Sequence, residues 1–270
     1  MSAIELRGVT KVFGRRSARA LALLDEGADK ARILAETDCV LGVANVSLTI
    51  EAGEVFVIMG LSGSGKSTLV RHLNRLVDPS RGEILVGGQN ILAFGQGRLR
   101  DFRRHEVSMV FQGFGLLPHK TVLDNVAYGL RLRGNGTKAS REQASHWVTQ
   151  VGLDGYTDHF PEQLSGGMRQ RVGLARALAC DTPIVLLDEA FSALDPLIRA
   201  DLQEQLRQLQ ARLRKTIVFI THDLDEALRL GDRIAILRDG QLVQVGTPQH
   251  ILQHPADDYV KRFVQRRAEN

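Results

Sequence analysis

The sequence predicts an α/β protein built on a mostly parallel β-sheet. Apolar runs such as Val55–Met59 and Ile184–Leu187 have the length and composition of strands buried on both faces. They alternate with amphipathic segments, which is typical of strand–helix–strand units. A chain of 270 residues is long enough for one large α/β domain or two small ones, with a substantial buried core.

Apolar runs bounded by turn residues are the expected strands. In chain order these are Ile4–Val9, Val43–Ile50, Val55–Met59, Glu83–Val86, Val107–Val110, Ile184–Leu187, Thr216–Ile220, Arg233–Leu237 and Leu242–Val245. Amphipathic segments are the expected helices. These are Lys66–Leu73, Val122–Leu132, Arg141–Val151, Met168–Ala179, Pro196–Leu213, Leu224–Leu230 and Asp258–Gln265. The region from about 112 to 165 is mostly helical, which predicts a helical subdomain inserted in the sheet.

The first two strands form an expected antiparallel β subdomain that is interrupted by a long segment, about residues 15–41. A hairpin normally needs only a few linking residues. Here the segment contains ALALLDEGADKARILAETDCV and is expected to form two short helices. Gly27 is expected to end the first, and Asp29 to cap the second. The apolar residues of the pair are Ala20, Leu21, Leu23 and Leu24, then Ile33 and Leu34.

Composition excludes several classes of protein. The net charge of +4 comes mostly from scattered arginines, without the aromatic-interleaved basic stripe of a nucleic-acid reader. Cys39 and Cys180 lie far apart and in no metal-ligand pattern, which fits a reducing cytoplasm. No apolar run reaches the roughly 18 residues of a membrane span, and MSAIELRG lacks the apolar core of a signal peptide.

The stretch GLSGSGKST follows an apolar strand and opens a helix, as a phosphate-binding loop does. Its glycines let backbone N–H groups curl around a β-phosphate, and the helix N-terminus adds favourable partial charge. Lys66 is expected to reach the β- and γ-phosphates, and Ser67 to hold Mg²⁺. The other expected nucleotide contacts are Gly60, Leu61, Ser62, Gly63, Ser64, Gly65 and Thr68.

Two adjacent carboxylates, Asp188 and Glu189, follow the buried strand IVLL at its carboxyl end, where ligands bind in such sheets. Neighbouring strand residues face opposite ways, so the two carboxylates can take different tasks. We expect Asp188 to position Mg²⁺ through its water shell and Glu189 to orient or deprotonate the attacking water. An apolar run followed by DE is common by itself, but beside a phosphate loop it indicates a nucleotide hydrolase.

Two further polar residues follow expected strands. His222 in FITHD is either a structural histidine or a contact to the γ-phosphate. Gln112, after VSMVF, is either a surface glutamine or a contact to Mg²⁺ and the attacking water.

The motif LSGGMRQR places Ser165, Gly166 and Gly167 directly before an expected helix, which makes a second anion-receptive N-terminus. One nucleotide has no room for two such loops from one chain. The economical arrangement is a head-to-tail pair of chains, in which each gives this loop to the nucleotide held by the other.

Together the motifs resemble those of the ATP-binding cassette (ABC) ATPases. GLSGSGKST, FQ, LSGGMRQR, IVLLDE, SALD and ITHD occur in that family's order over nearly the whole chain. The resemblance implies the P-loop NTPase fold of ABC ATPases in a single domain over residues 1–270, with ATP as substrate and Mg²⁺ as cofactor. It also implies that Phe13 stacks on adenine and that Asp195 is the D-loop aspartate. The remaining motif roles are Walker A for Gly60–Thr68, the Q-loop for Gln112, the signature for Ser165–Gly167, Walker B with its catalytic glutamate for Asp188 and Glu189, and the switch histidine for His222.

Longer stretches, such as LLPHKTVLDNVAYGL and DEAFSALDPLIR, resemble the ATPase subunits of bacterial quaternary-amine importers, the glycine betaine, proline and choline group. This implies a peripheral subunit on the cytoplasmic face of the inner membrane that energises import of a quaternary amine or an amino acid such as histidine. The implied partners are a second copy, integral-membrane permease subunits and, indirectly, a substrate-binding protein. Many members continue into a regulatory (CBS) module, which is not expected here because the chain stops at Asn270.

Several alternatives stay open. GFGLLPHKTV after Gln112 is either the groove for a permease coupling helix or a plain packing segment. An exporter ATPase or a non-transport ABC ATPase would carry the same motifs, but Gln112 and Ser165 lie only 53 positions apart (165 − 112), which excludes relatives with a long inserted coiled coil. The helical insert is either a pair packed on the sheet edge, or a lid over the adenine pocket or a contact to a neighbouring subunit.

Overall fold

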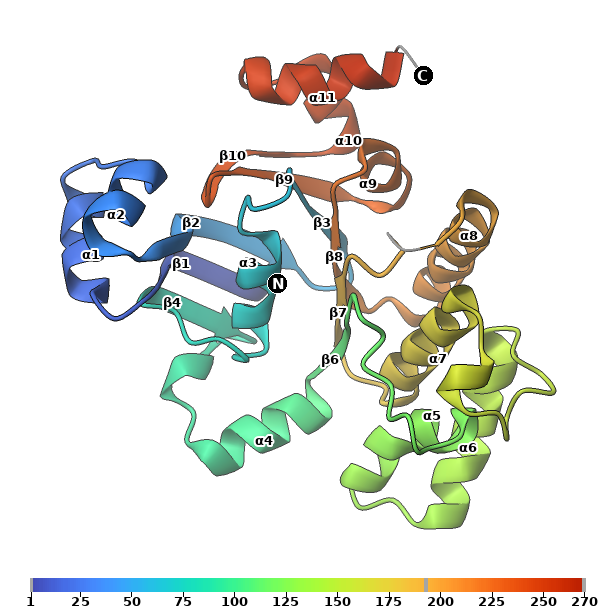
Figure 1. The fold of residues 1–270 in the computed structure, drawn as a ribbon. Coiled ribbons are helices and arrows are strands. Elements are labelled where there is room, and N and C mark those ends of the chain that lie inside the picture. Colours follow the sequence, from blue (N-terminus) through green and yellow to red (C-terminus); the bar gives the residue numbers. More distant parts are fainter. Residues whose placement is uncertain (1, 192–193, 269–270) are drawn as a thin grey trace. The chain divides into compact units, whose positions relative to one another are not determined.

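The computed structural model describes residues 2–191 and 194–268 (Figure 1). Ser192 and Ala193, which belong to the SALD motif, lie outside the described residues. The chain divides into two compact units. The first unit combines the described residues up to Phe94 with those from Ile220 onward, and the second runs from Gly95 to Phe219.

The first unit contains a four-stranded sheet in the order β2-β1-β4-β5. Strands β1 and β2 pair antiparallel, with Leu6 opposite Leu48, and β4 pairs antiparallel with the other edge of β1. This confirms the expected antiparallel pair on both sides of the helical insert. The strands are β1 (Ser2–Phe13), β2 (Val40–Glu51), β4 (Arg81–Val86) and β5 (Gln89–Asn90).

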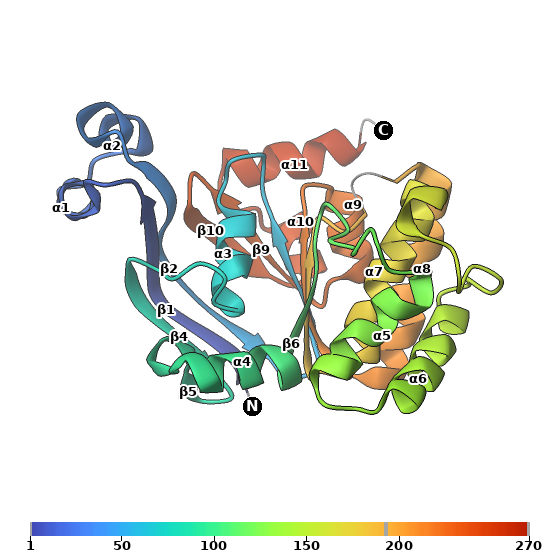
Figure 2. The same ribbon diagram turned by 60° about the horizontal axis from the view of Figure 1, so that its bottom comes forward.

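The insert forms the two expected helices, α1 (Ser17–Asp25) and α2 (Lys30–Thr37), which lie at one end of the β1–β2 pair (Figures 1 and 2). The Asp29 side chain accepts a hydrogen bond from the Arg32 N–H at 2.8 Å, so Asp29 is the expected cap. Apolar residues of both helices share a small core with the strands, while Leu34 stays 47% exposed. The buried members of this core are Val12, Ala20, Leu23, Ala28, Ile33, Cys39, Leu41 and Ala44. The body of the insert is therefore a helical pair packed on the sheet edge.

The same unit places a fully buried strand, β3 (Val55–Met59), parallel to β9 (Arg233–Arg238), and β10 (Gln241–Gly246) antiparallel to β9. The Asp232 carboxylate accepts from the Val55 N–H at 2.8 Å and fixes where β3 begins. The helical elements of this unit are α3 (Lys66–Leu73), the 3-10 turn η1 (Ile91–Ala93), α9 (Leu224–Leu230), α10 (Pro248–Gln253) and α11 (Asp258–Ala268).

The second unit pairs β6 (Val107–Val110) with β7 (Ile184–Asp188) in parallel, so that Val110 lies opposite Leu187. Helices α5, α6 and α7 pack on one another, as Figure 2 shows. Strand β8 (Thr216–Thr221) contains the boundary between the units. The helical elements are α4 (Gln96–His105), α5 (Val122–Leu132), α6 (Thr137–Gln150), the 3-10 turn η2 (Pro161–Gln163), α7 (Gly166–Ala179) and α8 (Pro196–Leu213).

The structure corrects the expected elements at several points. Helix α4 was not expected, because it buries only Leu99 and Phe102 and is otherwise strongly polar, and the short α10 buries only Ile251. Helix α6 begins at Thr137 rather than at Arg141. Helix α7 begins at Gly166, so the two glycines lie in its first turn and not before it.

None of the helices among residues 2–191 and 194–268 is both long enough and apolar enough to cross a membrane.

Candidate functional site

The loop from Gly60 to Gly65 connects β3 to α3 and has a backbone that requires glycine at Gly65. This residue precedes the helix with a φ of +99°, in the left-handed region. A Cβ at Gly65 would also collide with the carbonyl oxygen of Gly42. The loop therefore lies directly against β2 and leads into the N-terminus of α3, whose partial positive charge favours an anion.

Lys66 is buried, with 4% of its surface exposed, and lies within its own loop. Its Nζ donates to the carbonyl oxygens of Gly60 at 2.9 Å and Leu61 at 3.1 Å. Burying an ammonium is costly unless polar groups solvate it, and these two carbonyl dipoles contribute to that solvation.

The phosphate loop rests on the turn that joins β9 to β10. The Gly240 N–H donates to the Ser64 carbonyl at 3.0 Å, and the Gly240 carbonyl accepts from the Ala44 N–H at 2.8 Å. Ser64 Oγ is buried and has no hydrogen-bond partner among the described residues. The β9–β10 turn thus fixes one side of the loop through backbone hydrogen bonds, which no sequence motif indicates.

Tyr259 of α11 also holds the phosphate loop, which the sequence did not reveal. Its hydroxyl accepts from the Leu61 N–H at 3.3 Å and donates to the Leu237 carbonyl at 3.3 Å. Burial is the main cause that raises the pKa of Tyr259, so the hydroxyl keeps its proton at neutral pH. The contact spans 198 positions in the sequence, which explains why no local pattern indicates it.

We expect Tyr259→Phe to raise the KM for ATP about three- to tenfold with a smaller change in kcat, because the Leu61 N–H loses its acceptor and the loop its tether. Steady-state ATPase assays at varied ATP check this. Tyr156→Phe, at an exposed tyrosine of the second unit, is the matched control. An unchanged KM in Tyr259→Phe would contradict the role.

Phe13 ends β1 and is 40% exposed, with Lys11 Nζ 5.1 Å from its ring centroid. Its ring lies over Gly42, where a Cβ would approach Phe13 Cε2 to 2.9 Å and Thr68 Cγ2 to 3.1 Å. Gly42 therefore lets the aromatic ring, β2 and the first turn of α3 come together. The ring and the phosphate loop lie on the same part of the first unit, although Gly42 belongs to no motif.

His222 follows β8 and is exposed at the start of a capped turn. The Asp223 side chain accepts from the N–H groups of Asp225 and Glu226 and begins α9. The Thr221 hydroxyl donates to the Glu226 carboxylate. These hydrogen bonds fix the backbone on both sides of His222 and therefore the position from which its side chain extends.

In the second unit the structure brings Gln112 and Glu189 together. Gln112 Nε2 donates to Glu189 Oε2 at 2.8 Å, because both residues follow the carboxyl ends of the paired strands β6 and β7. Glu189 has a φ of +47°, a strained backbone that is frequent at functional sites. Asp188 is fully buried, whereas Glu189 is half-buried. The two adjacent carboxylates therefore differ in burial. Asp188 is the last residue of β7, and Glu189 lies beyond the strand in a left-handed conformation, so strand alternation is not the cause of this difference.

The signature residues lie at the start of α7. Ser165 caps the helix, since its Oγ accepts from the Met168 N–H at 3.3 Å, and Ser165 is exposed. Gly167 lies against α8, where a Cβ would meet Ile198 Cγ2 at 2.7 Å. Asp195 caps α8 by accepting from the Ile198 N–H at 3.0 Å. The signature and the D-loop aspartate are thus joined through Ile198.

The segment that follows Gln112 is held by two arginines of α7. Arg176 donates to the carbonyls of Gly115 at 2.7 Å and Phe114 at 3.1 Å, and Arg169 lies 5.2 Å from the Phe114 ring centroid. Burial is the main cause that lowers the pKa of Arg176. The helix that begins with the signature therefore contacts the segment that begins with Gln112.

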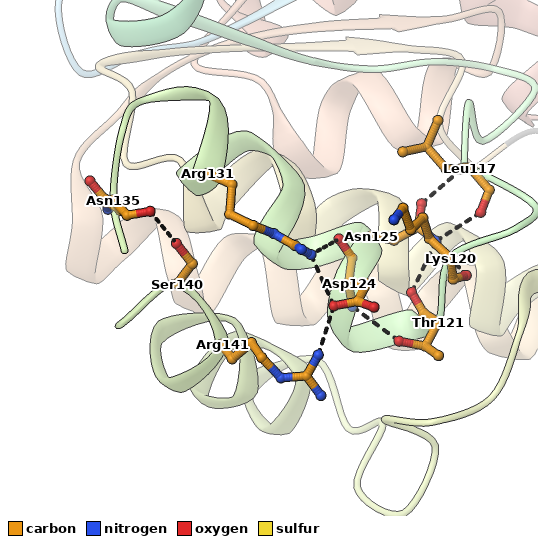
Figure 3. Close-up of polar contacts among 9 residues, drawn as sticks. All are labelled: Leu117, Lys120, Thr121, Asp124, Asn125, Arg131, Asn135, Ser140 and Arg141. Carbon is orange, nitrogen blue, oxygen red and sulfur yellow. Dashed lines mark hydrogen bonds and ion pairs between the residues drawn. The ribbon is translucent and has the colours of Figure 1, made fainter. Parts of the chain in front are cut away.

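The far end of that segment is organised by Asn125, a fully buried residue of α5 (Figure 3). Its Oδ1 accepts from the Leu117 N–H at 2.8 Å, and its Nδ2 donates to the carbonyls of Leu117, Lys120 and Thr121 at 3.0–3.1 Å. Asp124 accepts from both Arg131 and Arg141, which joins α5 to α6. One amide thereby fixes the backbone from Leu117 to Thr121.

The oxygen-donor character of Ser67, Gln112 and Asp188 fits Mg²⁺, which prefers hydroxyl, carbonyl and carboxylate oxygens. Ser67, the rest of the phosphate loop, Phe13 and His222 belong to the first unit. The second unit contains the other candidate site residues, which are Gln112, Ser165, Gly166, Gly167, Asp188, Glu189 and Asp195. Their assigned roles stay predictions.

Fold and site define a nucleotide-binding α/β protein of the P-loop class. The chain belongs to the ABC transporter family, which residues 43–192 match. It is 55% identical over 260 residues to the glycine betaine/proline betaine transport system ATP-binding protein ProV of Escherichia coli (strain K12), covering 96% of this chain and 65% of ProV. It is 53% identical to the glycine betaine/carnitine transport ATP-binding protein GbuA of Listeria monocytogenes, covering 98% of this chain and 67% of GbuA. The chain thus spans about two thirds of the length of these relatives.

Among solved structures, the dimeric structure of MJ0796, a bacterial ABC transporter cassette, resembles the chain with a TM-score of 0.78 and 33% identity. The match covers 91% of this chain and 98% of MJ0796. It confirms the expected ABC-ATPase fold, with a mostly parallel core sheet, an antiparallel β subdomain and a helical subdomain.

Proposed function

We propose that this chain is the ATP-hydrolysing subunit of an ABC importer for a quaternary amine or an amino acid. The observation that carries the proposal is the hydrogen bond between Gln112 and Glu189, because Gln112 begins the segment that Asn125 and Arg176 hold in shape. Glu189, which is suited to activating water, is thereby joined through Gln112 to the segment that we propose receives the permease. The names of ProV and GbuA support glycine betaine and related amines as the substrate class.

In the proposed reaction, Lys66 exchanges its two loop carbonyls for phosphate oxygens, and the N–H groups at the start of α3 bind the β-phosphate. Glu189 orients or deprotonates the attacking water, and His222 contacts the γ-phosphate. When bound, Mg²⁺ supplies charge compensation between the phosphates. Ser67, Gln112 and Asp188 would hold the ion.

The proposed working form is a head-to-tail dimer in which Ser165, Gly166 and Gly167 of one copy complete the nucleotide site of the other. The exposed, capped start of α7 supports this, as does the likeness to the dimeric MJ0796 structure. The remaining proposed partners are integral-membrane permease subunits, with a substrate-binding protein reached through them. Under this proposal the chain acts as a peripheral subunit at the cytoplasmic face of the inner membrane.

Uptake of labelled glycine betaine, choline, proline and histidine in a strain that lacks this subunit tests the proposal. Restored uptake of at least one of these substrates by the wild-type gene, and not by a Glu189→Gln gene, is the expected result. A pull-down then asks whether the membrane partner works with a substrate-binding protein. Complementation of export instead of uptake would replace the importer with an exporter ATPase.

We expect Asn125→Ala and Leu117→Asp to uncouple transport from hydrolysis, because both alter the segment proposed to receive the permease. Uptake should fall at least about fivefold, while basal ATPase activity of the purified chain stays within about twofold. Asn135→Ala, at an exposed residue beyond the same helix, is the control. Unaltered uptake in Leu117→Asp would count against the groove and favour a plain packing segment.

A further inference from the structure

Lys30, the first residue of α2, reaches from the helical insert to the phosphate loop. Its Nζ donates to the carbonyl oxygen of Gly63 at 3.0 Å, across 33 positions of sequence. The buried apolar residues of α1 and α2 pack into the small core on β1 and β2. Lys30 is not part of that core, so its contact with Gly63 is separate from the packing of the insert. It points away from that core and toward the loop that Lys66 serves.

Gly63 occupies an exposed part of the phosphate loop. It has a φ of +76°, is exposed, and a Cβ placed on it would meet no described atom within 4 Å. Leu61 is tied to Tyr259, and Ser64 to Gly240, and Gly63 lies between these two contacts in the sequence. The Lys30 ammonium is the contact found at that carbonyl among the described residues.

The insert also begins and ends at the aromatic ring proposed to bind adenine. Phe13 lies opposite Val40 in the β1–β2 register, and the insert occupies the sequence between them. Gly14 approaches Cys39 so closely that a Cβ there would lie 2.6 Å from Cys39 Sγ. The insert is therefore anchored beside Phe13 at both ends and reaches the phosphate loop with Lys30.

We propose that Lys30 is a positioning residue of the nucleotide site, and that the insert holds the tip of the phosphate loop in its phosphate-binding shape. This inference rests on the proposed function. An ammonium on the Gly63 carbonyl polarises the peptide whose N–H belongs to Ser64 and restrains a backbone that otherwise moves before binding. Ordering a loop in advance strengthens binding because less conformational entropy is lost on association. The effect should extend to ATP and ADP alike, since both carry the β-phosphate.

The test compares Lys30→Met, which keeps an unbranched side chain one atom shorter and removes its charge, with Lys30→Arg, which keeps a charged donor. Arg32→Met is the matched control, because Arg32 lies on the same helix and pairs with Glu36 instead of the loop. Lys30→Met should weaken binding of fluorescent ATP and ADP analogues about three- to tenfold. Lys30→Arg and Arg32→Met should stay within about twofold of the wild type.

Amide hydrogen exchange without nucleotide supplies a readout that does not depend on catalysis. Exchange across the peptide that contains residues 60–66 should be faster in Lys30→Met than in Arg32→Met. Thermal unfolding without nucleotide should be unchanged, since Lys30 lies outside the core of the insert. Unchanged affinity in Lys30→Met, or unchanged exchange in this peptide, would overturn the inference. Absence of ATP binding by the wild type, or normal binding by Lys66→Ala, would instead overturn the proposed function.

Discussion

Glu189→Gln is expected to abolish ATP turnover while leaving ATP binding intact. The amide keeps the size of the side chain and an oxygen that can accept from Gln112 Nε2, so the local geometry survives. It cannot take a proton from the attacking water. Loss of a general base typically costs about 10²–10⁴-fold in rate, and phosphate release under saturating ATP measures it.

The same variant should accumulate as a dimer with ATP, because the closed state forms but cannot be left through hydrolysis. Size-exclusion chromatography with and without ATP detects the change. Glu142→Gln, at an exposed glutamate of α6, is the control and should stay active and show no trapped dimer. Normal hydrolysis by Glu189→Gln would remove Glu189 from the proposed role, and loss of binding would indicate that the substitution damages the fold.

Lys66→Ala is expected to lose most of its affinity for ATP. The Lys66 ammonium is buried in the loop and solvated by the Gly60 and Leu61 carbonyls, so its removal leaves the site without its fixed positive charge. Truncating one partner of a buried charge pair costs about 2–5 kcal/mol, which corresponds to a weakening of at least about 30-fold. Binding of a fluorescent ATP analogue to the purified chain checks the value.

Lys138→Ala is the control for this experiment, since Lys138 is an exposed lysine of α6 in the second unit. It should bind the analogue as the wild type does. Thermal unfolding without nucleotide should show that Lys66→Ala is folded, because a small side chain at this position leaves the loop glycines free to keep their backbone. Wild-type affinity in Lys66→Ala would show that the loop does not bind phosphate as proposed.

Several elements could be predicted from the sequence to the residue. The bounds of β3, β6, α3, α5, α8 and α9 agree with those expected. These elements have strong local determinants: continuous apolar runs in the strands, and caps such as Thr121 and Asp195 at the helices. The sequence did not predict the polar helix α4 and the short α10, because each buries too few residues to show a helical repeat of apolar positions.

The sequence indicated the motifs of the candidate site, whose roles stay predictions, but not the contacts that support them. Gln112 and Glu189 each follow an apolar strand, so the parallel pairing of β6 with β7 brings them into contact. Lys30, Tyr259 and Asn125 could not be found this way. Tyr259 contacts a residue 198 positions away, and Lys30 one that is 33 positions away, at distances that no local spacing encodes.

The sequence by itself determined the fold class, because apolar periodicity, glycine spacing and capping side chains act over a few neighbouring positions. The family followed from the resemblance of its motifs, and of their order, to those of the ABC ATPases. Tertiary structure alone decided what holds the phosphate loop. Gly42 permits the close approach of Phe13 and Thr68, and the β9–β10 turn supports Ser64. Tyr259 binds the loop at Leu61, and Lys30 binds it at Gly63. These contacts arise where distant segments meet on folding, so they depend on the path of the whole chain rather than on any stretch of it.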